Sequence, residues 1–279
     1  MFNLLRKKIG IIGFGNMGSA IAEKIKSRYE VFVFEKDAAK TKGLTGIKIA
    51  PGILQLFKQS QVIILAIKPQ DFESVMAEIK DGVQDKLIIS IAAGITTGYI
   101  EKFLGQARVV RAMPNLGAKI GKSVTCLTKG QFASEQDMEL AKNIFSSIGV
   151  VQEFKEDMMN AATAISGSGP GYYFYAVASD PDEYKANSRK FHEEFIISLT
   201  EAARSIGFDD KSARFLANWT IEYSDLLLKQ TKLPAQELAK QVASKGGTTE
   251  AALGILHKGG SLVDAVRAAV ERAKELSRG

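Results

Sequence analysis

The segment Lys8–Ala20 limits the possible folds of this chain more than any other. It begins as an apolar run, reaches closely spaced glycines and resumes with the spacing of an amphipathic helix. Gly13, Gly15 and Gly18 fit G-x-G-x-x-G, in which the first glycine permits a tight turn, the second lets the backbone approach a pyrophosphate and the third lets helix pack on strand. The helix N-terminus then directs free N–H groups at the anion. A strand, a phosphate-binding turn and a helix are therefore predicted, with a dinucleotide held at Gly13, Phe14, Gly15, Asn16, Met17 and Gly18.

A second strand is predicted over residues 30–35, and it ends on an acid. Glu35 lies 17 residues beyond Gly18. A carboxylate at this place accepts hydrogen bonds from the adenosine ribose and repels a 2′-phosphate, which favours NADH over NADPH. The basic residues Lys36, Lys40 and Lys42 follow at once. They are equally consistent with pairing to a 2′-phosphate and with a solvated face, so either NADH or NADPH fits, with a preference for NADH.

Strands and helices alternate through the rest of the first half, which is the pattern of a doubly wound parallel sheet. The continuous apolar run 61–67 is typical of a buried parallel strand and stops at a proline, so Ala66, Lys68 and Pro69 fall at the carboxyl edge, where open α/β sheets bind ligands. The pattern predicts strands at 46–49, 86–91, 107–112, 123–128 and 150–154, and helices at 53–59, 71–80, 96–104 and 134–148.

The second half contains only helical patterns. The fold class is therefore α/β, with a Rossmann-type doubly wound sheet over residues 1–154 and an all-helical domain over 155–279 that supplies the substrate site and a dimer interface. A turn is expected at Ser166–Gly171 and a polar excursion at 180–189. The predicted helices are 157–165, 170–178, 192–206, 211–229, 234–243, 249–257 and 261–277.

Composition excludes several classes of function. The net charge is +6, but basic residues are scattered among nearly as many acidic ones, which argues against nucleic acid as a partner. The charge-free stretch Met158–Ser179 is interrupted by glycines and a proline, so no membrane span is expected. Cys126 is the single cysteine and is expected in the core of a cytoplasmic protein, and the first eight residues do not resemble a signal peptide. His192 and His257 lack metal-ligand spacing, so no metal site is predicted.

A second glycine turn occurs at residues 242–253. Paired glycines, Gly246 and Gly247, precede a predicted helix that opens with Thr248 and Thr249. Such a turn directs several N–H groups at one point, and a helix N-terminus of this kind can bind a carboxylate while a threonine hydroxyl bonds the neighbouring atom. An ordinary glycine turn with a threonine cap remains an alternative.

At these residues the chain resembles the pyrroline-5-carboxylate reductase family, which catalyses the last step of proline synthesis. The resemblance spans nearly the whole length. It rests on six motifs in order, which are Gly13–Gly18 with Ala20, Ala66–Gln70, Ser90–Gly94, Arg111–Asn115, Ser166–Pro170 and Gly246–Thr249.

The resemblance implies hydride transfer from a nicotinamide cofactor to the C=N carbon of 1-pyrroline-5-carboxylate, giving L-proline. It also implies a homodimer or higher homo-oligomer with the active site at the interface of the helical domains. By the same match, Gly247 and Thr248 donate N–H groups to the substrate carboxylate with Ser244 nearby, and Thr249 bonds the imine nitrogen. The match assigns the nicotinamide end to Ala66, Pro69, Met113, Pro114 and Asn115.

Four residues at three places depart from the family pattern. The family continues the Met-Pro-Asn loop with Thr-Pro, whereas Leu116-Gly117 stands here. Lys245 replaces a proline before the paired glycines and adds a positive charge beside the carboxylate site, which either tightens binding or admits another acid. Gln241 replaces a more usual Asn or Asp.

Two other functions compete with the reductase. A hydroxyacid dehydrogenase of related architecture would reduce C=O, but such enzymes place a catalytic lysine on the first helix after the sheet domain, and Asp157–Ile165 has none. The other is a non-catalytic NAD(P)-binding regulatory protein, which the departures at Leu116-Gly117 and Lys245 keep open.

Overall fold

The computed structural model describes residues 6–277, except for the side chain of Pro69. Within that range the chain forms two compact units, of which the first comprises residues 6–113, 125–156 and Ser277, and the second comprises 114–124 and 157–276. The predicted first domain includes residues 114–124, but in the structure their contacts place them in the second unit. The division at 154/155 stays a prediction about the domains.

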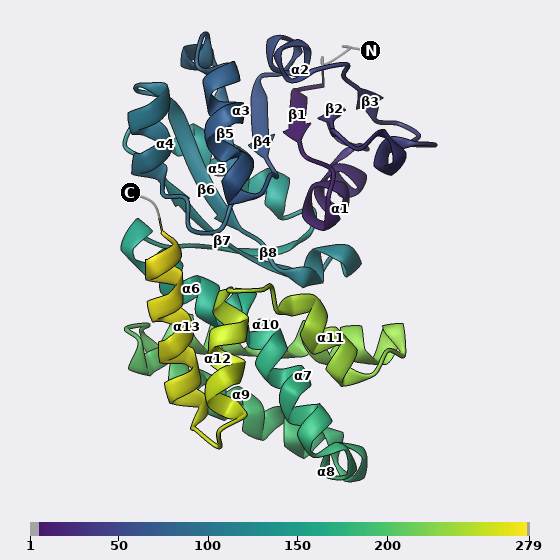
Figure 1. Cartoon of the computed structure of the whole chain (residues 1–279), viewed down its shortest axis with the longest axis vertical. Helices are drawn as coiled ribbons and strands as arrows, with labels where there is room; N and C mark the ends of the chain where they lie inside the picture. Colours follow the sequence, from purple (N-terminus) through teal and green to yellow (C-terminus); the bar gives the residue numbers. More distant parts are fainter. Residues whose placement is uncertain (1–5, 278–279) are drawn as a thin grey trace. The chain divides into compact units, whose positions relative to one another are not determined.

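The first unit is built on a mostly parallel sheet, in which the order of the described strands is β3-β2-β1-β4-β5-β6-β7-β8 (Figure 1). The strands are β1 (Lys8–Ile12), β2 (Glu30–Phe34), β3 (Lys48–Ile49), β4 (Val62–Leu65), β5 (Leu87–Ser90), β6 (Arg108–Met113), β7 (Ser123–Lys129) and β8 (Gly149–Glu153). Central strands β4 and β5 are buried along their whole length, as expected for apolar runs covered on both faces. The order β3-β2-β1-β4-β5-β6 is that of a Rossmann sheet, which confirms the predicted fold class.

Strand β7 departs from the parallel arrangement of β1 to β6. It pairs antiparallel with β6, with Met113 opposite Cys126. Cys126 is fully buried, so its expected place in the core is confirmed. The two sides of this pair lead into and out of the loop 114–124, so β6 and β7 carry the chain to the second unit and back.

Helices pack against the sheet through their apolar faces. Leu56, Phe72 and Ile100 are buried in one cluster with Ile63 and Ile88 of the sheet, so the helices that carry the first three cover the same face. The helices of this unit are α1 (Asn16–Ile25), α2 (Ile53–Gln59), α3 (Phe72–Ile79), α4 (Thr97–Leu104) and α5 (Glu135–Phe145). These bounds agree with the predicted alternation to within a few residues.

The second unit is helical where the structure describes it. Its helices are α6 (Met159–Ala162), α7 (Gly169–Ser179), α8 (Pro181–Ala186), α9 (Ser188–Ser205), α10 (Asp210–Thr231), α11 (Ala235–Val242), α12 (Thr248–Leu256) and α13 (Leu262–Leu276). The turn expected at Ser166–Gly171 is wrong, because residues Thr163–Gly167 form a π-helical segment that joins α6 to α7. A π-bulge accommodates the extra residue while the chain continues in nearly the same direction, and such bulges are frequent at functional sites.

The polar excursion expected at residues 180–189 is the short helix α8 followed by the first turn of α9. Tyr184 of α8 donates its hydroxyl hydrogen to Asp225 at 2.7 Å, and Tyr173 of α7 does the same at 3.0 Å. Burial raises the pKa of Asp225, but Lys229 and the two tyrosines outweigh this and hold the pKa below its ordinary value. The segment is therefore anchored on α10 through a charged carboxylate and is not a loose insertion.

Candidate functional sites in the two units

The first glycine turn has the geometry that its motif predicts. Gly13 has φ +97°, and a Cβ atom there would lie 2.4 Å from the carbonyl oxygen of Ala66. A Cβ on Gly18 would lie 2.2 Å from the carbonyl oxygen of Gly13. A Cβ on Gly15, the residue before α1, would meet no described atom within 4 Å. The fold itself thus requires the first and third glycines, whereas the second leaves open space where the backbone can approach a ligand.

A cavity of about 390 Å³ lies over this turn in the first unit. Its volume is within the range of small-molecule sites. The predicted residues that line it are Gly13, Gly15, Glu35, Lys36, Ala66 and Lys68, and it is completed by Ile12, Phe34, Lys40, Ile53, Ile67, Gln70, Asp71, Ser74 and Val75.

Among the residues whose side chains the structure describes, the remaining predicted cofactor residues are absent from the lining of this cavity. Phe14 is buried, and Asn16 and Met17 lie in the first turn of α1. Met113 is the last residue of β6. The predicted contact of Pro69 rests on a side chain outside the described part of the chain.

Glu35 is held by the glycine turn itself. Its Oε2 accepts the Phe14 N–H at 2.7 Å and its Oε1 accepts the Asp37 N–H at 3.1 Å. Burial raises the pKa of the Glu35 carboxyl, but the two N–H donors and Lys40 outweigh burial and leave the pKa below its ordinary value. The carboxylate is therefore charged at neutral pH and fixed at the mouth of the cavity, where it can accept from hydroxyl groups and repel a phosphate.

The two neighbouring lysines already face carboxylates. Lys36 Nζ lies 3.4 Å from Asp71 Oδ1, and Lys40 Nζ lies 3.5 Å from Glu35 Oε1. Lys36 is largely exposed and Asp71 partly so, which makes that pair weak in water, whereas Lys40 is half exposed and faces the nearly buried Glu35. A 2′-phosphate at this place would have to compete with these acids for the same cations.

Asn115, predicted to contact the cofactor, makes its hydrogen bonds within the second unit. Its N–H donates to Ser123 Oγ at 3.1 Å and its Nδ2 donates to the carbonyl of Ser166 at 3.0 Å. Its Oδ1 accepts the N–H groups of Gly117 and Val124, both at 3.2 Å. The side chain is buried and ties the loop 114–124 to the π-helical segment, so it acts as a structural brace in this conformation. Pro114, the other predicted contact, begins the same loop.

The departure at Leu116-Gly117 fits a tight loop. These residues open a 3₁₀ turn over Leu116–Ile120. A Cβ on Gly117 would lie 2.6 Å from the carbonyl oxygen of Lys122 and 3.0 Å from the Tyr223 ring. The loop thus packs against α10 so closely that only glycine fits.

The second glycine turn precedes α12, as predicted, and it is held at both ends. Gly246 has φ +70°, which favours glycine. Its N–H donates to Glu250 Oε2 at 2.6 Å, and its carbonyl accepts Arg272 Nε–H at 2.7 Å. The Gly247 N–H donates to the carbonyl of Ser244 at 2.9 Å, so in this conformation it is not available to a ligand.

The free donors at this site come one residue later than predicted. Among the described residues, no acceptor is found for the N–H groups of Thr248, Thr249 and Glu250, which are the first three of α12. These groups carry the positive end of the helix dipole. The N-terminus of α12 can therefore bind a carboxylate through Thr248, Thr249 and Glu250.

Two threonine hydroxyls converge on one serine beside these N–H groups. Thr249 Oγ1 donates to Ser168 Oγ at 3.0 Å, and Thr248 Oγ1 lies 2.8 Å from the same oxygen. Thr249 and Ser168 are 4% and 1% exposed. A Cβ on Gly171 would lie 2.5 Å from Thr249 Cγ2, so α7 carries glycine where the threonine packs against it. Buried hydroxyls in such a chain have fixed directions, because each must find a partner.

Ser168, Glu250 and Arg272 were missed by the sequence interpretation. Ser168 follows the π-helical segment, and the signal for it is the motif Ser166–Pro170, one of the six that carry the resemblance. Glu250 stands one residue after the predicted pair of threonines. Arg272 lies 26 residues from Gly246, and no local pattern connects the two.

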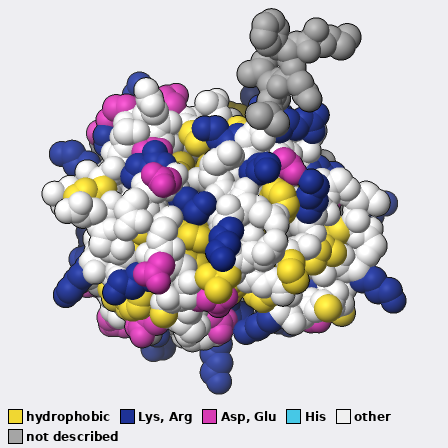
Figure 2. Space-filling model, turned by 90° about the horizontal axis from the view of Figure 1, so that it is seen from above, with side chains coloured by type: hydrophobic (Ala, Val, Ile, Leu, Met, Phe, Trp, Pro, Cys, Tyr) yellow, Lys and Arg dark blue, Asp and Glu magenta, His cyan; other side chains and the backbone are white. Residues whose placement is uncertain are grey.

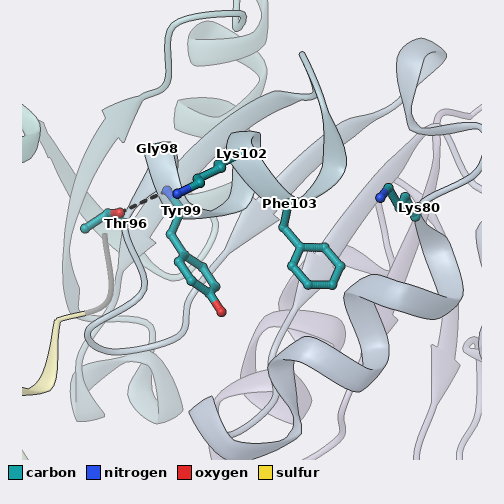
Figure 3. A pocket seen from close by; sticks show the side chains of 6 residues that line it. All are labelled: Lys80, Thr96, Gly98, Tyr99, Lys102 and Phe103. Carbon is teal, nitrogen blue, oxygen red and sulfur yellow. Dashed lines mark hydrogen bonds between the residues drawn. The ribbon is translucent and has the colours of Figure 1, made fainter.

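A second cavity of the first unit, of about 640 Å³, lies between α3 and α4. Figure 3 shows the rings of Tyr99 and Phe103 side by side within it, with Lys80 and Lys102 at its edges. None of the predicted site residues lines it. Its lining has exposed lysines but no glycine turn.

Two further observations concern the surface charge and the lengths of the helices. On the face shown in Figure 2, lysine and arginine side chains are spread among acidic and neutral ones and form no continuous basic patch. In the part of the chain that the structure describes, no helix is long and apolar enough to cross a membrane.

Two family models match the chain, one in each half. Residues 8–94, which contain the first glycine turn, match the model described as NADP oxidoreductase, coenzyme F420-dependent. Residues 191–276, which contain the second glycine turn, match the model described as pyrroline-5-carboxylate reductase dimerisation. The C-terminal helices are thus similar to a dimerisation domain.

Full-length relatives give the same result. The chain is 31% identical to a pyrroline-5-carboxylate reductase of Synechocystis sp., over 97% of this chain and 98% of the relative. It is 30% identical to the solved structure of a pyrroline-5-carboxylate reductase from Coxiella burnetii, over 98% and 100% of the two chains, with a TM-score of 0.65. The pyrroline carboxylate reductase of Plasmodium falciparum, crystallised with NADP bound, is 28% identical over 99% and 100%, with a TM-score of 0.63. The chain therefore belongs to the pyrroline-5-carboxylate reductase family.

Proposed function

We propose that this protein reduces 1-pyrroline-5-carboxylate to L-proline with NADH or NADPH, the last step of proline biosynthesis. The observation that carries the proposal is the N-terminus of α12, where free N–H groups and the Thr249 hydroxyl adjoin one another in a chain of this family. A cyclic imine that carries a carboxylate presents an anion for the N–H groups and a nitrogen for the hydroxyl.

The N–H groups of Thr248, Thr249 and Glu250 bind the substrate carboxylate in this proposal. Hydrogen bonds from backbone N–H groups to a charged acceptor are stronger than neutral ones. The helix dipole adds to them, and exposed Lys245 adds a further positive charge nearby. Ser244, Gly246 and Gly247 shape the turn without donating to the ligand.

Thr249 stabilises the reactive form of the imine. Because its hydroxyl hydrogen is donated to Ser168, its oxygen retains lone pairs that can accept the N–H of a protonated imine. Protonation makes the C=N carbon electrophilic, so the site needs orientation and exclusion of water more than a strong acid. The carbon gains a hydride, the C=N π electrons become a lone pair on nitrogen, and the product is a secondary amine.

The first glycine turn fits a nicotinamide dinucleotide, which supplies the hydride when bound. The open space at Gly15 and the N-terminus of α1 receive the pyrophosphate, and Glu35 accepts from the adenosine ribose. We assign the nicotinamide end to Ala66, Lys68, Pro69 and Met113, which follow β4 or end β6.

Purified protein should oxidise NADH or NADPH when 1-pyrroline-5-carboxylate is added. The loss of absorbance at 340 nm and the appearance of proline measure this directly. No oxidation of either nucleotide, by protein that binds them, would instead support the regulatory function. Turnover of a 2-keto acid and not of the imine would support the hydroxyacid dehydrogenase.

Glu35 sets the choice of cofactor in this proposal. We expect a higher kcat/KM with NADH than with NADPH. Replacing the charge in Glu35→Gln, which keeps an acceptor for Phe14, should lower the NADH to NADPH ratio of kcat/KM by about tenfold, because the repulsion of the 2′-phosphate is removed. Lys36→Gln serves as the control, because it also removes a charge at the mouth of this cavity. A wild-type preference for NADPH would show that Lys36 and Lys40 dominate over the carboxylate.

We further propose that the protein forms a homodimer through the helical unit and acts in the cytoplasm. Ile197 on α9 is 59% exposed, within the span that matches the dimerisation model. Ile197→Asp should weaken the dimer, because the substitution places a charge in an apolar contact. Leu54→Asp on α2, where the leucine is 48% exposed, should leave assembly unchanged. Sedimentation velocity of the two variants over a concentration series measures the effect.

A further inference from the structure

Two charged side chains from different helices hold the turn before α12 at a single residue. Glu250 lies in the first turn of α12 and accepts the Gly246 N–H at 2.6 Å. Arg272 lies on α13 and donates Nε–H to the Gly246 carbonyl at 2.7 Å. The peptide groups on both sides of Gly246 are therefore fixed by charged partners, and charge-assisted hydrogen bonds are roughly twice as strong as neutral ones.

The residue held in this way has a conformation that needs support. Gly246 has φ +70°, and a Cβ there would lie 3.4 Å from Arg272 Nη2. Glycine loses more conformational freedom on ordering than any other residue, so a glycine turn is soft unless other groups hold it. The direction of this turn fixes where the helix begins, and hence where the N–H groups of Thr248 and Thr249 point.

Arg272 is itself oriented from the far side. Its Nη1 donates to Glu275 Oε2 at 2.7 Å, one turn further along α13. The Arg272 side chain is 34% exposed, so it lies at the rim of the turn and not in the core. A residue in this place affects the turn without being needed for the fold of the helices.

We propose that Arg272 and Glu250 form a clamp on Gly246, and that Arg272 is a positioning residue for the substrate carboxylate. This inference rests on the proposed reductase function. The clamp acts equally on the ground state and the transition state, because the carboxylate does not change charge in the reaction. Its loss should therefore raise KM for the imino acid and leave kcat nearly unchanged.

Steady-state kinetics of Arg272→Gln test this prediction. We expect KM for 1-pyrroline-5-carboxylate to rise about tenfold, the loss of one charge-assisted hydrogen bond, with kcat and the KM for NADH within about twofold of wild type. Arg272→Lys should recover part of the loss. The matched control is Arg267→Gln on the same helix, because Arg267 is exposed and lies 3.9 Å from Asp264, its partner. An unchanged KM in Arg272→Gln, or an equal rise in Arg267→Gln, would overturn the clamp.

Hydrogen exchange tests the clamp independently of catalysis. Amide exchange of a peptide covering residues 244–252 should be faster in Arg272→Gln than in wild type, with peptides of α9 and α10 unchanged. Arg267→Gln should leave the same peptide unchanged. If exchange is faster in Arg272→Gln but the wild-type protein fails to reduce the imine, the clamp is supported and the reductase function is rejected. Unaltered exchange would reject the clamp whatever the activity.

Discussion

Thr249→Ala is expected to lower kcat/KM for 1-pyrroline-5-carboxylate by about 10- to 150-fold. This range corresponds to the loss of a hydrogen bond to a charged group, about 1.5–3 kcal/mol. The hydroxyl is 4% exposed and bonded to Ser168, so its oxygen has a fixed direction before any substrate binds. Most of the loss should appear in kcat, because without this acceptor a smaller fraction of the bound imine is protonated and able to take the hydride.

Thr249→Ser and Ser168→Ala separate the hydroxyl from its surroundings. Thr249→Ser keeps the hydroxyl and loses only the methyl group, so it should retain most of the activity. Ser168→Ala removes the acceptor that orients Thr249 and should lower kcat by a smaller factor. Stopped-flow measurement of hydride transfer distinguishes these effects from product release. Equal rates for Thr249→Ala and wild type would show that the imine nitrogen is bound elsewhere.

Gly15→Ala and Gly18→Ala should fail in different ways. A Cβ on Gly18 would meet the Gly13 carbonyl oxygen at 2.2 Å, so Gly18→Ala forces apart helix and strand and should destabilise the fold by about 1–3 kcal/mol. At Gly15 a Cβ would meet nothing within 4 Å. Gly15→Ala should therefore lose less than about 1 kcal/mol, mainly because alanine is a poorer helix cap.

For Gly15→Ala, cofactor binding should be affected much more than stability. Its added methyl group occupies the space that we assign to the pyrophosphate, so Kd for NADH should rise at least about tenfold. Thermal unfolding without ligand and calorimetric titration with NADH measure the two effects on the same preparations. Gly98→Ala on α4 is the control, because a Cβ there also meets nothing within 4 Å and lies away from the turn. Normal NADH binding by Gly15→Ala would show that the cofactor does not approach this residue.

The fold could be predicted largely from local patterns. Buried runs such as Val62–Leu65 have few alternatives to a central parallel strand, and G-x-G-x-x-G requires glycine for reasons that lie within a few residues. The role of Glu35 and anion binding at the turn before α12 were inferred in the same way, whereas the role of Thr249 followed from the family resemblance. They remain predictions about binding, although the geometry of both turns suits them.

Other features depended on residues far apart in the chain. Asn115 resembled a cofactor contact because of its motif, yet its side chain braces the loop 114–124 against Ser166. Residues 180–189 were expected to form a polar excursion, because nothing in their composition reveals that Asp225 accepts from Tyr184. The serine and glycine content of Ser166–Gly171 favoured a turn, but packing of the flanking apolar residues maintains a helical path through a π-bulge.

Amino-acid order was sufficient for the two glycine turns, the alternation of strands and helices and the family, because each depends on backbone sterics or on hydrophobic periodicity over short spans. It was not sufficient for the chemistry of the second turn. The N–H groups that remain free at the start of α12 depend on two hydrogen bonds. The Gly247 N–H donates to the Ser244 carbonyl, and the Gly246 N–H donates to the Glu250 carboxylate. The partners Ser168 and Arg272 lie 81 and 26 residues from the groups they bind, and hydrogen bonds at such separation exist only after helices have packed.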